Sequence, residues 1–283
     1  MRIIKRKKGK KFYYYLKHSF RKDSKVHTRE IYLGNKVPRN IRRIKDKLMN
    51  DINKDLYKKL ESIRKSFHEE WKRVPESAKK KELHNIAISF TYNTNAIEGS
   101  TITLEETREL IEDGISPNKP IRDVKETESH YKVFLDMLKE KEKITNNLQL
   151  KWHKDIFSET KFDIAGKFRD YLVRVGDYIA PDWQDVKKLM SNLIKFVNQK
   201  NINPVELAGR SHFIFESIHP FGDGNGRIGR LLMNYILWHS GYPMIIIEYK
   251  KRSSYYKAFK RGEDGFLNYF FRRYLSIHKN RTR

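Results

Sequence analysis

Glycines and polar side chains are concentrated in one stretch of an otherwise helical sequence, His219-Pro-Phe-Gly-Asp-Gly-Asn-Gly-Arg-Ile-Gly-Arg230. An apolar pattern at helical spacing follows, so the stretch leads into a helix. Gly224 and Gly226 leave backbone N–H groups uncovered at the start of that helix, where the helix dipole also favours an anion. Asn225 adds a side-chain donor. This arrangement is typical of a phosphate-binding loop.

The other polar side chains of the stretch supply further parts of a phosphate-transfer site. Arg227 and Arg230 are three residues apart, so they share a helix face and can each donate two N–H groups to phosphate oxygens. Asp223 stands beside the loop, and a lone carboxylate next to bound phosphates commonly holds Mg²⁺. His219 titrates near working pH, so it can take a proton from an attacking hydroxyl. Together these residues predict phosphoryl or nucleotidyl transfer.

A dinucleotide-binding turn is an alternative interpretation of the same glycines. Gly224-x-Gly226-x-x-Gly229 satisfies the pattern, and Met244–Glu248 resembles a strand that ends in an acid about 20 residues further on. However, the pattern requires a buried strand running into the first glycine, and residues 205–218 have helical spacing instead. A NAD-binding oxidoreductase therefore stays as the weakest of the functional hypotheses.

A calcium loop that begins at Asp223 is a second alternative. It would place Arg227, a cation, at its fifth position. It would also have Asn234 at the twelfth position, where such loops carry a glutamate. The sequence excludes this interpretation.

The whole of His219–Arg230 resembles the signature of the Fic family, His-x-Phe-x-Asp/Glu-Gly-Asn-Gly-Arg-x-x-Arg, and all eight defined positions agree. Upstream, Gly166-x-x-Arg169-x-x-x-Val173-x-Val175 is similar to the flap of that family. Ala208, His212 and Phe215 precede the signature as they do in the family. The resemblance covers roughly residues 93–241.

The resemblance implies an α-helical enzyme that transfers AMP from ATP to a Ser, Thr or Tyr hydroxyl of a target protein, with Mg²⁺ as cofactor and pyrophosphate as product. His219 would be the general base, Asp223 the Mg²⁺ ligand and Phe221 the anchor of the loop in the core. The residues that bind the nucleotide would be Gly224, Asn225, Gly226, Arg227, Arg230 and Asn234. The flap over residues 167–178 would hold the target chain by strand addition.

A second stretch, Thr94-Asn-Ala-Ile-Glu98-Gly99, resembles the inhibitory sequence Ser/Thr-x-x-x-Glu-Gly/Asn of the Fic class that carries it N-terminal to the catalytic residues. A carboxylate that ends a helix against Arg230 would form a bidentate ion pair. That pair would occupy the arginine that the γ-phosphate needs and would slow transfer by orders of magnitude. The resemblance therefore implies autoinhibition by Glu98. It also allows the same glutamate to support removal of AMP.

Hydrophobic periodicity, together with the positions of glycine, proline and helix-capping residues, predicts the elements that hold these residues. Helical spacing covers residues 41–81 (one helix or a pair), 84–98, 103–113, 124–139, 148–159, 183–198, 205–218, 226–239 and a segment beyond 253. Gly99 is placed for a left-handed helix cap, and Thr103-Leu-Glu-Glu106 matches a capping box. Alternation within residues 166–181 predicts a short flap hairpin. Residues 11–20 and 26–33 predict an N-terminal β-hairpin. The expected fold is mainly α, a Fic helical core with a flap and a basic N-terminal hairpin.

Charge is unevenly distributed along the chain. The net charge is +25, and residues 1–50 carry 18 basic and 3 acidic residues, which leaves +15 (18 − 3) in that segment. We expect a basic hairpin region at 1–50, a helical region at 51–140 that includes an inhibitory helix at 84–99, and the catalytic core with C-terminal helices at 141–283. The basic surplus suggests an anionic partner. The alternative function is therefore a nucleic-acid-binding regulator with the core as a nucleotide sensor.

The aromatic run Phe12–Tyr15 has two interpretations. Flanking Lys and Arg residues would suit base stacking, and the same residues would also form one half-buried strand. Lack of cysteine excludes disulfides, thiolate zinc sites and a Cys nucleophile. His153, His212 and His239 lack a second ligand at zinc-like spacing, so we expect hydrogen-bonded structural residues there and not metal ligands.

No apolar run approaches the roughly 20 residues of a membrane span, and the basic N-terminus leads into aromatics, not a signal-peptide core. We expect a cytoplasmic protein without a membrane partner. The family resemblance also allows a homodimer.

Overall fold

The computed structural model describes residues 1–22 and 25–282. The chain divides into two compact units, Met1–Lys59 and Leu60–Arg283. The boundary between them falls inside the long helix α1 (Ile41–Arg73).

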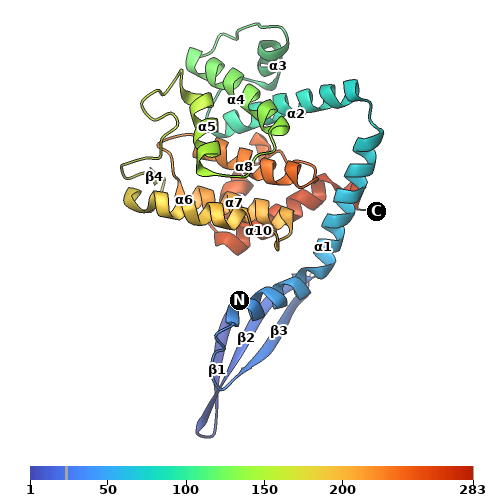
Figure 1. The fold of residues 1–283 in the computed structure, drawn as a ribbon, viewed down its shortest axis with the longest axis vertical. Helices are drawn as coiled ribbons and strands as arrows, with labels where there is room; N and C mark the ends of the chain where they lie inside the picture. Colours follow the sequence, from blue (N-terminus) through green and yellow to red (C-terminus); the bar gives the residue numbers. More distant parts are fainter. Residues whose placement is uncertain (23–24, 283) are drawn as a thin grey trace. The chain divides into compact units, whose positions relative to one another are not determined.

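The first unit is an antiparallel three-stranded sheet with the first part of α1. The strands are β1 (Arg2–Lys8), β2 (Lys11–Lys22) and β3 (Lys25–Gly34), in the order β1-β2-β3 (Figure 1). The predicted hairpin is present as β2 and β3. The sequence analysis did not predict β1, because its seven residues include only two apolar ones. Gly9, at positive φ, begins the two-residue turn that joins β1 to β2.

The core of this unit lies on one side of the sheet. Leu16 and Leu33 of the sheet are buried against Leu48 of α1, with Ile31 and Ile44 packed at the edge. Because successive side chains of a strand point to opposite faces, the residues that alternate with Leu16 lie on the other face of the sheet.

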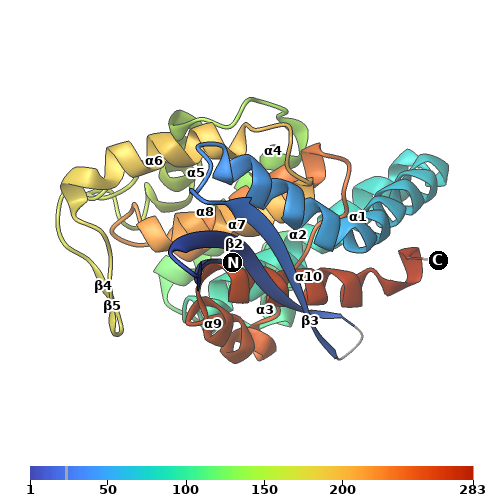
Figure 2. The same ribbon diagram turned by 90° about the horizontal axis from the view of Figure 1, so that it is seen from below.

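The second unit is mainly helical, as predicted. Its helices are α2 (Glu76–Ile97), α3 (Leu104–Glu112), α4 (Ile121–Lys139), α5 (Asn146–Phe157), α6 (Trp183–Val197), α7 (Pro204–Ile218), α8 (Asn225–His239), α9 (Arg252–Phe259) and α10 (Gly262–Ile277). Short 3₁₀ helices cover Tyr249–Lys251 and Lys279–Arg281. A two-stranded hairpin, β4 (Arg174–Val175) with β5 (Tyr178–Ile179), forms the predicted flap and extends away from the helices (Figure 2).

Helix α8 lies at the centre of this unit. Every residue from Asn225 to Leu237 is buried, and α8 packs against α7, α4, α2 and α5 (Figure 1). A helix that is buried on all sides must be apolar or must pair its polar groups internally. The polar residues at its N-terminal end are therefore held by neighbouring elements.

Most predicted helix ends agree closely with the structure, but the predicted start at 84 is wrong: α2 begins at Glu76 and runs unbroken to Ile97. Thr103 and Glu106 form the capping box at the start of α3, with both of its hydrogen bonds present. Gly99 has φ of +99° directly after α2. Residues 41–81 form parts of two helices, because Pro75 separates α1 from α2.

The strand that the dinucleotide interpretation expected at Met244–Glu248 is absent. These residues form no strand and no sheet, and the element before the glycines is helix α7. A dinucleotide turn requires a strand at that place, so that hypothesis is wrong. No helix in the described part of the chain combines the length and apolarity needed to cross a membrane.

Candidate active site

The glycine-rich loop begins where α7 ends. His219 caps α7 in the left-handed region, with φ of 51° and ψ of 60°, and no other non-glycine residue in the described ranges has a positive φ. Such a conformation is unfavourable for a residue with a β-carbon, and it is typical of functional sites. Gly224, at φ of +77°, forms the N-cap of α8, so the loop spans the short gap between two packed helices.

Two side chains hold the loop in shape. The Asn225 side chain donates to the Phe221 carbonyl (2.9 Å) and accepts from the Phe221 N–H (2.8 Å). Phe221 is fully buried and stacks on His153, with 3.9 Å between ring centroids. Phe221 therefore lies where the anchoring role would place it. The amide of Asn225 is occupied by the loop itself, which leaves its backbone N–H for an anion.

His153 joins this loop to the flap segment. Its Nδ1 accepts from the Gly166 N–H (3.0 Å), so the proton of the neutral ring is on Nε2, which donates to the Asp223 carbonyl (3.0 Å). Burial lowers the pKa of His153 to about 4, which keeps the ring neutral. The sequence analysis expected a structural histidine here.

Arg169 binds the backbone of His219 and of the residue that follows it. Its Nε donates to the His219 carbonyl (2.8 Å) and its backbone N–H to the Pro220 carbonyl (2.9 Å). The guanidinium also donates to the carbonyls of Tyr171 (2.8 Å) and Pro181 (2.6 Å), at the two ends of the flap. One buried side chain thus ties the cap of α7 to both ends of the β4–β5 hairpin.

Burial lowers the pKa of His219 below its ordinary value. Desolvation disfavours the charged imidazolium, and the positive charge of Arg169 acts in the same direction. The ring is therefore neutral at pH 7, the form that can accept a proton.

Arg230 is held at the end of α2. Its Nη2 donates to Glu98 Oε1 (2.6 Å) and to the Thr94 carbonyl (3.2 Å), and its Nε donates to Thr94 Oγ1 (2.7 Å). The arginine side chain is 1% exposed. The ion pair that the sequence analysis expected is present, but it uses one carboxylate oxygen and is not bidentate. The hydroxyl and carbonyl of Thr94 accept from Nε and from the same Nη2.

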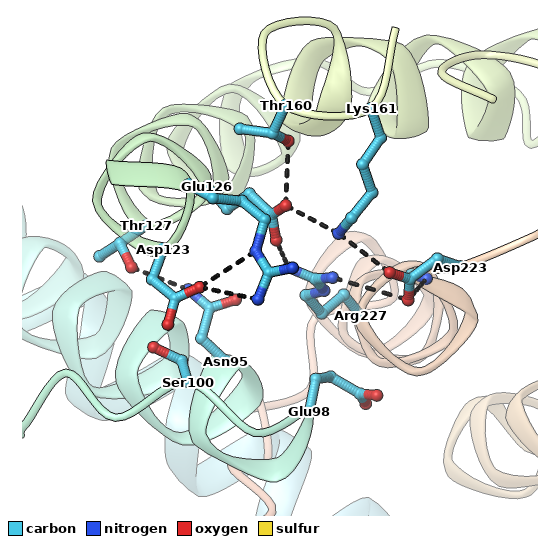
Figure 3. Close-up of polar contacts among 12 residues, drawn as sticks. Asn95, Glu98, Ser100, Asp123, Glu126, Thr127, Thr160, Lys161, Asp223 and Arg227 are labelled. Atoms are coloured by element: carbon cyan, nitrogen blue, oxygen red, sulfur yellow. Dashed lines mark hydrogen bonds and ion pairs between the residues drawn. The ribbon is translucent and has the colours of Figure 1, made fainter. Parts of the chain in front are cut away.

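Arg227 is held by a second carboxylate, which the sequence analysis did not find. Its Nη1 donates to Glu126 of α4 (Figure 3). Its guanidinium lies over the Phe157 ring, 4.4 Å from the centroid. Glu126 also accepts from Thr160 Oγ1 (2.9 Å). Burial opposes ionisation of Glu126, but Arg227 and Lys161 outweigh it and lower its pKa.

Lys161 links Glu126 to the loop. Its Nζ lies 2.7 Å from Glu126 Oε1 and 2.9 Å from Asp223 Oδ2 (Figure 3). Asp223, Lys161, Glu126 and Arg227 thus form one continuous chain of alternating charge. A polar pocket of about 250 Å³ opens beside it. The lining residues are Asn95, Glu98, Gly99, Ser100, Arg122, Asp123, Glu126, Lys161, Asp223 and Arg227.

Asp223 is the side chain at this pocket that suits a metal. Within residues 1–22 and 25–282, no three His, Cys, Asp or Glu side chains gather in a way that could hold an ion. The Asp223 side chain is 47% exposed and lines the pocket at the start of α8. This donor set fits Mg²⁺ that takes its other ligands from phosphates and water, and it does not fit an all-protein site.

Asn234 lies outside the loop and has a structural role. Its Nδ2 donates to the Ile245 carbonyl (3.0 Å), and its Oδ1 accepts from the Ile245 N–H (2.9 Å). The residue is fully buried. Both ends of its amide are used by the backbone, so we do not include Asn234 in the nucleotide site proposed below.

These features define a class of site before any comparison. Uncovered backbone N–H groups start a buried helix, two arginines project from its first turns, and a neutral histidine stands at the preceding cap. Such an arrangement is chemically suited to holding phosphates beside a base. In agreement, residues 143–237 match the Fic/DOC family, so the chain contains a Fic/DOC family domain.

Curated relatives resemble this chain over much of its length. The protein adenylyltransferase Fic of Nematostella vectensis is 34% identical over 189 residues, which cover 64% of this chain and 44% of that protein. The protein adenylyltransferase fic-1 of Caenorhabditis briggsae is 29% identical over 256 residues, covering 87% of this chain and 49% of that protein. The chain thus spans less than half the length of either relative.

Solved structures share the fold. A Fic domain-containing signalling protein from Bacteroides thetaiotaomicron aligns with a TM-score of 0.67 at 25% identity, covering 78% of this chain and 96% of that one. Fic-1 from C. elegans aligns with a TM-score of 0.69 at 25% identity, covering 85% and 74% of the two chains. The expected mainly α Fic fold is therefore confirmed.

Proposed function

We propose that this protein transfers AMP from ATP to a hydroxyl side chain of a target protein and releases pyrophosphate. The observation that carries the proposal is the position of neutral His219 at the cap before the anion-binding start of α8, inside the Fic/DOC match. The names of the curated relatives agree with this activity.

In the proposed reaction, His219 takes the proton of the target hydroxyl. The hydroxyl oxygen attacks the α-phosphorus, a new P–O bond forms, and the bond from that phosphorus to the bridging oxygen of pyrophosphate breaks. The N–H groups of Gly224, Asn225 and Gly226 would stabilise negative charge on the phosphates. The lowered pKa of His219 keeps the base available at neutral pH.

Arg227 and Arg230 would bind the β- and γ-phosphates through their guanidinium groups. Mg²⁺, held by Asp223 together with phosphate oxygens, would neutralise charge on the bound triphosphate. In the structure all three side chains have protein partners: Glu126 for Arg227, Glu98 for Arg230 and Lys161 for Asp223. ATP must therefore compete with these pairs.

We assign to Glu98 the role of inhibitor. Its carboxylate holds the arginine that the γ-phosphate would need, at 2.6 Å, in a site that excludes water from that arginine. Misplacing a γ-phosphate misaligns the α-phosphate for attack, which is costly in rate. The same carboxylate lies near enough to the loop to direct a water molecule in the reverse reaction, removal of AMP.

The flap would hold the target chain. Val175 and Ile179 are exposed on β4 and β5, and the two short strands have open edges for strand addition. The Tyr178 hydroxyl donates to the Ser217 carbonyl (2.6 Å), which fixes the hairpin close to the end of α7. A target segment paired with the flap would therefore lie close to His219.

The test compares wild type, Glu98→Gly and Glu98→Gly/His219→Ala, each incubated with α-labelled ATP and Mg²⁺, with label on the protein itself as the readout. We expect labelling in Glu98→Gly to exceed wild type by about 100-fold. The double variant should carry no label. Equal labelling in all three, or none in Glu98→Gly while ATP still binds, would reject the proposal.

A further inference from the structure

The first unit has a sheet face that its own core does not use. The residues that alternate with Leu16 and Ile31 point away from α1, and their rings meet there: Tyr32 contacts Tyr13 and Tyr15, with ring centroids 6.2 and 5.4 Å apart. We call this surface the tyrosine face. It consists of Arg2, Ile4, Arg6, Lys8, Lys11, Tyr13, Tyr15, Lys17, Ser19, Thr28, Glu30 and Tyr32, which pair across the strands.

The tyrosine face is strongly positive. It carries five basic residues and one acid, a net charge of +4 (5 − 1). The acid, Glu30, is already neutralised by Arg6 (2.9 Å) and Lys17 (3.3 Å). In the part of the chain that the structure describes, the exposed side chains of Arg2, Lys8 and Lys11 have no carboxylate partner. A folded face with this much unpaired positive charge is complementary to a polyanion.

The shape of the sheet selects among polyanions. Three strands spaced about 4.8 Å apart make a surface about 10 Å wide, and the major groove of B-form DNA is about 12 Å wide. The major groove of A-form RNA is deep and narrow and does not admit such a surface. Lys8 and Lys11 flank the β1–β2 turn and Arg2 lies near the other end of β1, so cations stand at both ends of the face.

The tyrosines favour a duplex over a single strand. Base stacking needs flat, open ring faces. Here the rings of Tyr13 and Tyr15 are half-buried, tilted 42° and 49° against Tyr32, and Arg6 covers the Tyr15 ring at 4.6 Å. Tyr32 is 54% exposed and its hydroxyl donates to Asn35 Oδ1 (3.3 Å), so its oxygen can still accept from a base edge and the exposed part of the ring can contact the groove.

We propose that the tyrosine face binds double-stranded DNA in the major groove. This inference is independent of AMP transfer, because it uses no residue of the nucleotide site. It gives a function to the basic surplus that the catalytic site does not use.

The test measures fluorescence anisotropy of a labelled mixed-sequence DNA duplex with the full chain at two salt concentrations. Lys8→Glu/Lys11→Glu should weaken binding about tenfold or more and make it less salt-dependent. The matched control is Lys187→Glu/Lys188→Glu on α6, two exposed lysines with the same change of net charge. It should change binding less than about twofold, because it lies outside the tyrosine face.

Tyr32→Ala provides a second variant that leaves the charge and the turn unchanged. It should weaken binding while the salt dependence stays as in wild type, because it removes a contact that is not ionic. An equal loss of DNA affinity in the two double-lysine variants would overturn the proposal, because it would indicate charge attraction without a defined site. Tighter binding to a single strand of the same sequence, or equal competition by polyglutamate, would also overturn it.

Discussion

The carboxylate of Glu98 lies against Gly226, in the space that a β-carbon at position 226 would occupy. From there it reaches Arg230, one helical turn further along α8. Because glycine has no side chain, the first turn of α8 leaves room for the end of α2. Gly226 therefore does more than uncover a backbone N–H for phosphate: it also admits the carboxylate that we propose as inhibitor.

The effect of Gly226→Ala on stability should depend strongly on whether Glu98 is present. In wild type the new methyl group must displace the carboxylate from the buried Arg230, so we expect a lower melting temperature. In Glu98→Gly the carboxylate is absent, and the freed Arg230 side chain, whose Nη1 would lie 2.9 Å from the new β-carbon, can shift. Alanine should then be neutral or stabilising because it favours the helix by up to about 1 kcal/mol. Chemical denaturation of the four proteins gives the coupling free energy, expected at about 1 kcal/mol or more.

Additive effects of the two substitutions on the free energy of unfolding would contradict this prediction. If the alanine costs the same with and without Glu98, the carboxylate does not occupy the space beside Gly226 in solution. Gly229 is the matched comparison site: a β-carbon there would meet Glu216 and His212 at 2.8 and 2.9 Å, so Gly229→Ala should be destabilising in both backgrounds.

Glu126→Gln should keep the fold but increase the rise in melting temperature that ATP causes. The amide keeps the shape of the carboxylate but leaves the charges of Arg227 and Lys161 without their buried partner, so we expect a marked loss of stability. ATP would supply the missing negative charge, and the rise in melting temperature on adding ATP should exceed that of wild type. Thermal unfolding with and without ATP measures both effects.

The control for this variant is Glu128→Gln, a change of the same kind on the same helix α4. We expect little effect on stability or on the response to ATP there. An ATP response in Glu126→Gln that matches wild type would show that Glu126 does not compete with phosphate for Arg227.

Glu216 predicts a dependence of stability on pH. Burial raises its pKa to about 8, and its Oε1 has no hydrogen-bond partner in the described structure. A carboxyl whose folded pKa is raised stabilises the fold fully below its unfolded pKa, and this contribution is lost as pH rises through about 8. The unfolding free energy of wild type should therefore fall between pH 6.5 and 8.5, where buried neutral histidines do not titrate.

Glu216→Gln should remove that fall, because the amide does not ionise. Urea titrations across the same pH range test the prediction, and Glu263→Gln, a change at a 41% exposed glutamate that is paired with Arg210, serves as the control. If the unfolding free energy of Glu216→Gln still falls with pH, a group other than Glu216 causes the fall.

The pH profile of AMP transfer should report His219. Because burial lowers its pKa below the ordinary 6.5, the acidic limb of kcat/KM in Glu98→Gly should have its midpoint below pH 6.5. Above that pH the base is neutral and the rate should level off. A midpoint above pH 6.5 would indicate that the charged form of His219 is stabilised, or that a different group acts as base.

Helix caps are predicted correctly from the sequence, because they depend on residues that are neighbours along the chain. The capping box at Thr103 and the left-handed Gly99 involve residues within one turn of each other. The pairing of Glu98 with Arg230, 132 positions apart, was predicted only through resemblance to a family. The structure adds that Thr94 shares this arginine.

Long-range charge pairs could not be predicted from periodicity. Glu126 and Arg227 are 101 positions apart, and Glu126 sits on α4 in a helix turn that also carries ordinary surface residues. Its sole sequence signal is an acid at an apolar-facing position, which is weak on its own. β1 was missed for a related reason: its Lys and Arg residues hide the alternation that marks a strand.

The anchoring of the flap by Arg169 has a consequence for how its specificity can change. Every acceptor that this guanidinium uses is a backbone carbonyl, and every amino acid has one. Residues 172–180 can therefore be exchanged without losing the Arg169 contacts beside His219, provided that Tyr178, whose hydroxyl donates to the Ser217 carbonyl, is kept. A loop taken from another chain that keeps this tyrosine, grafted between Tyr171 and Pro181, should stay attached and bring its own choice of partner.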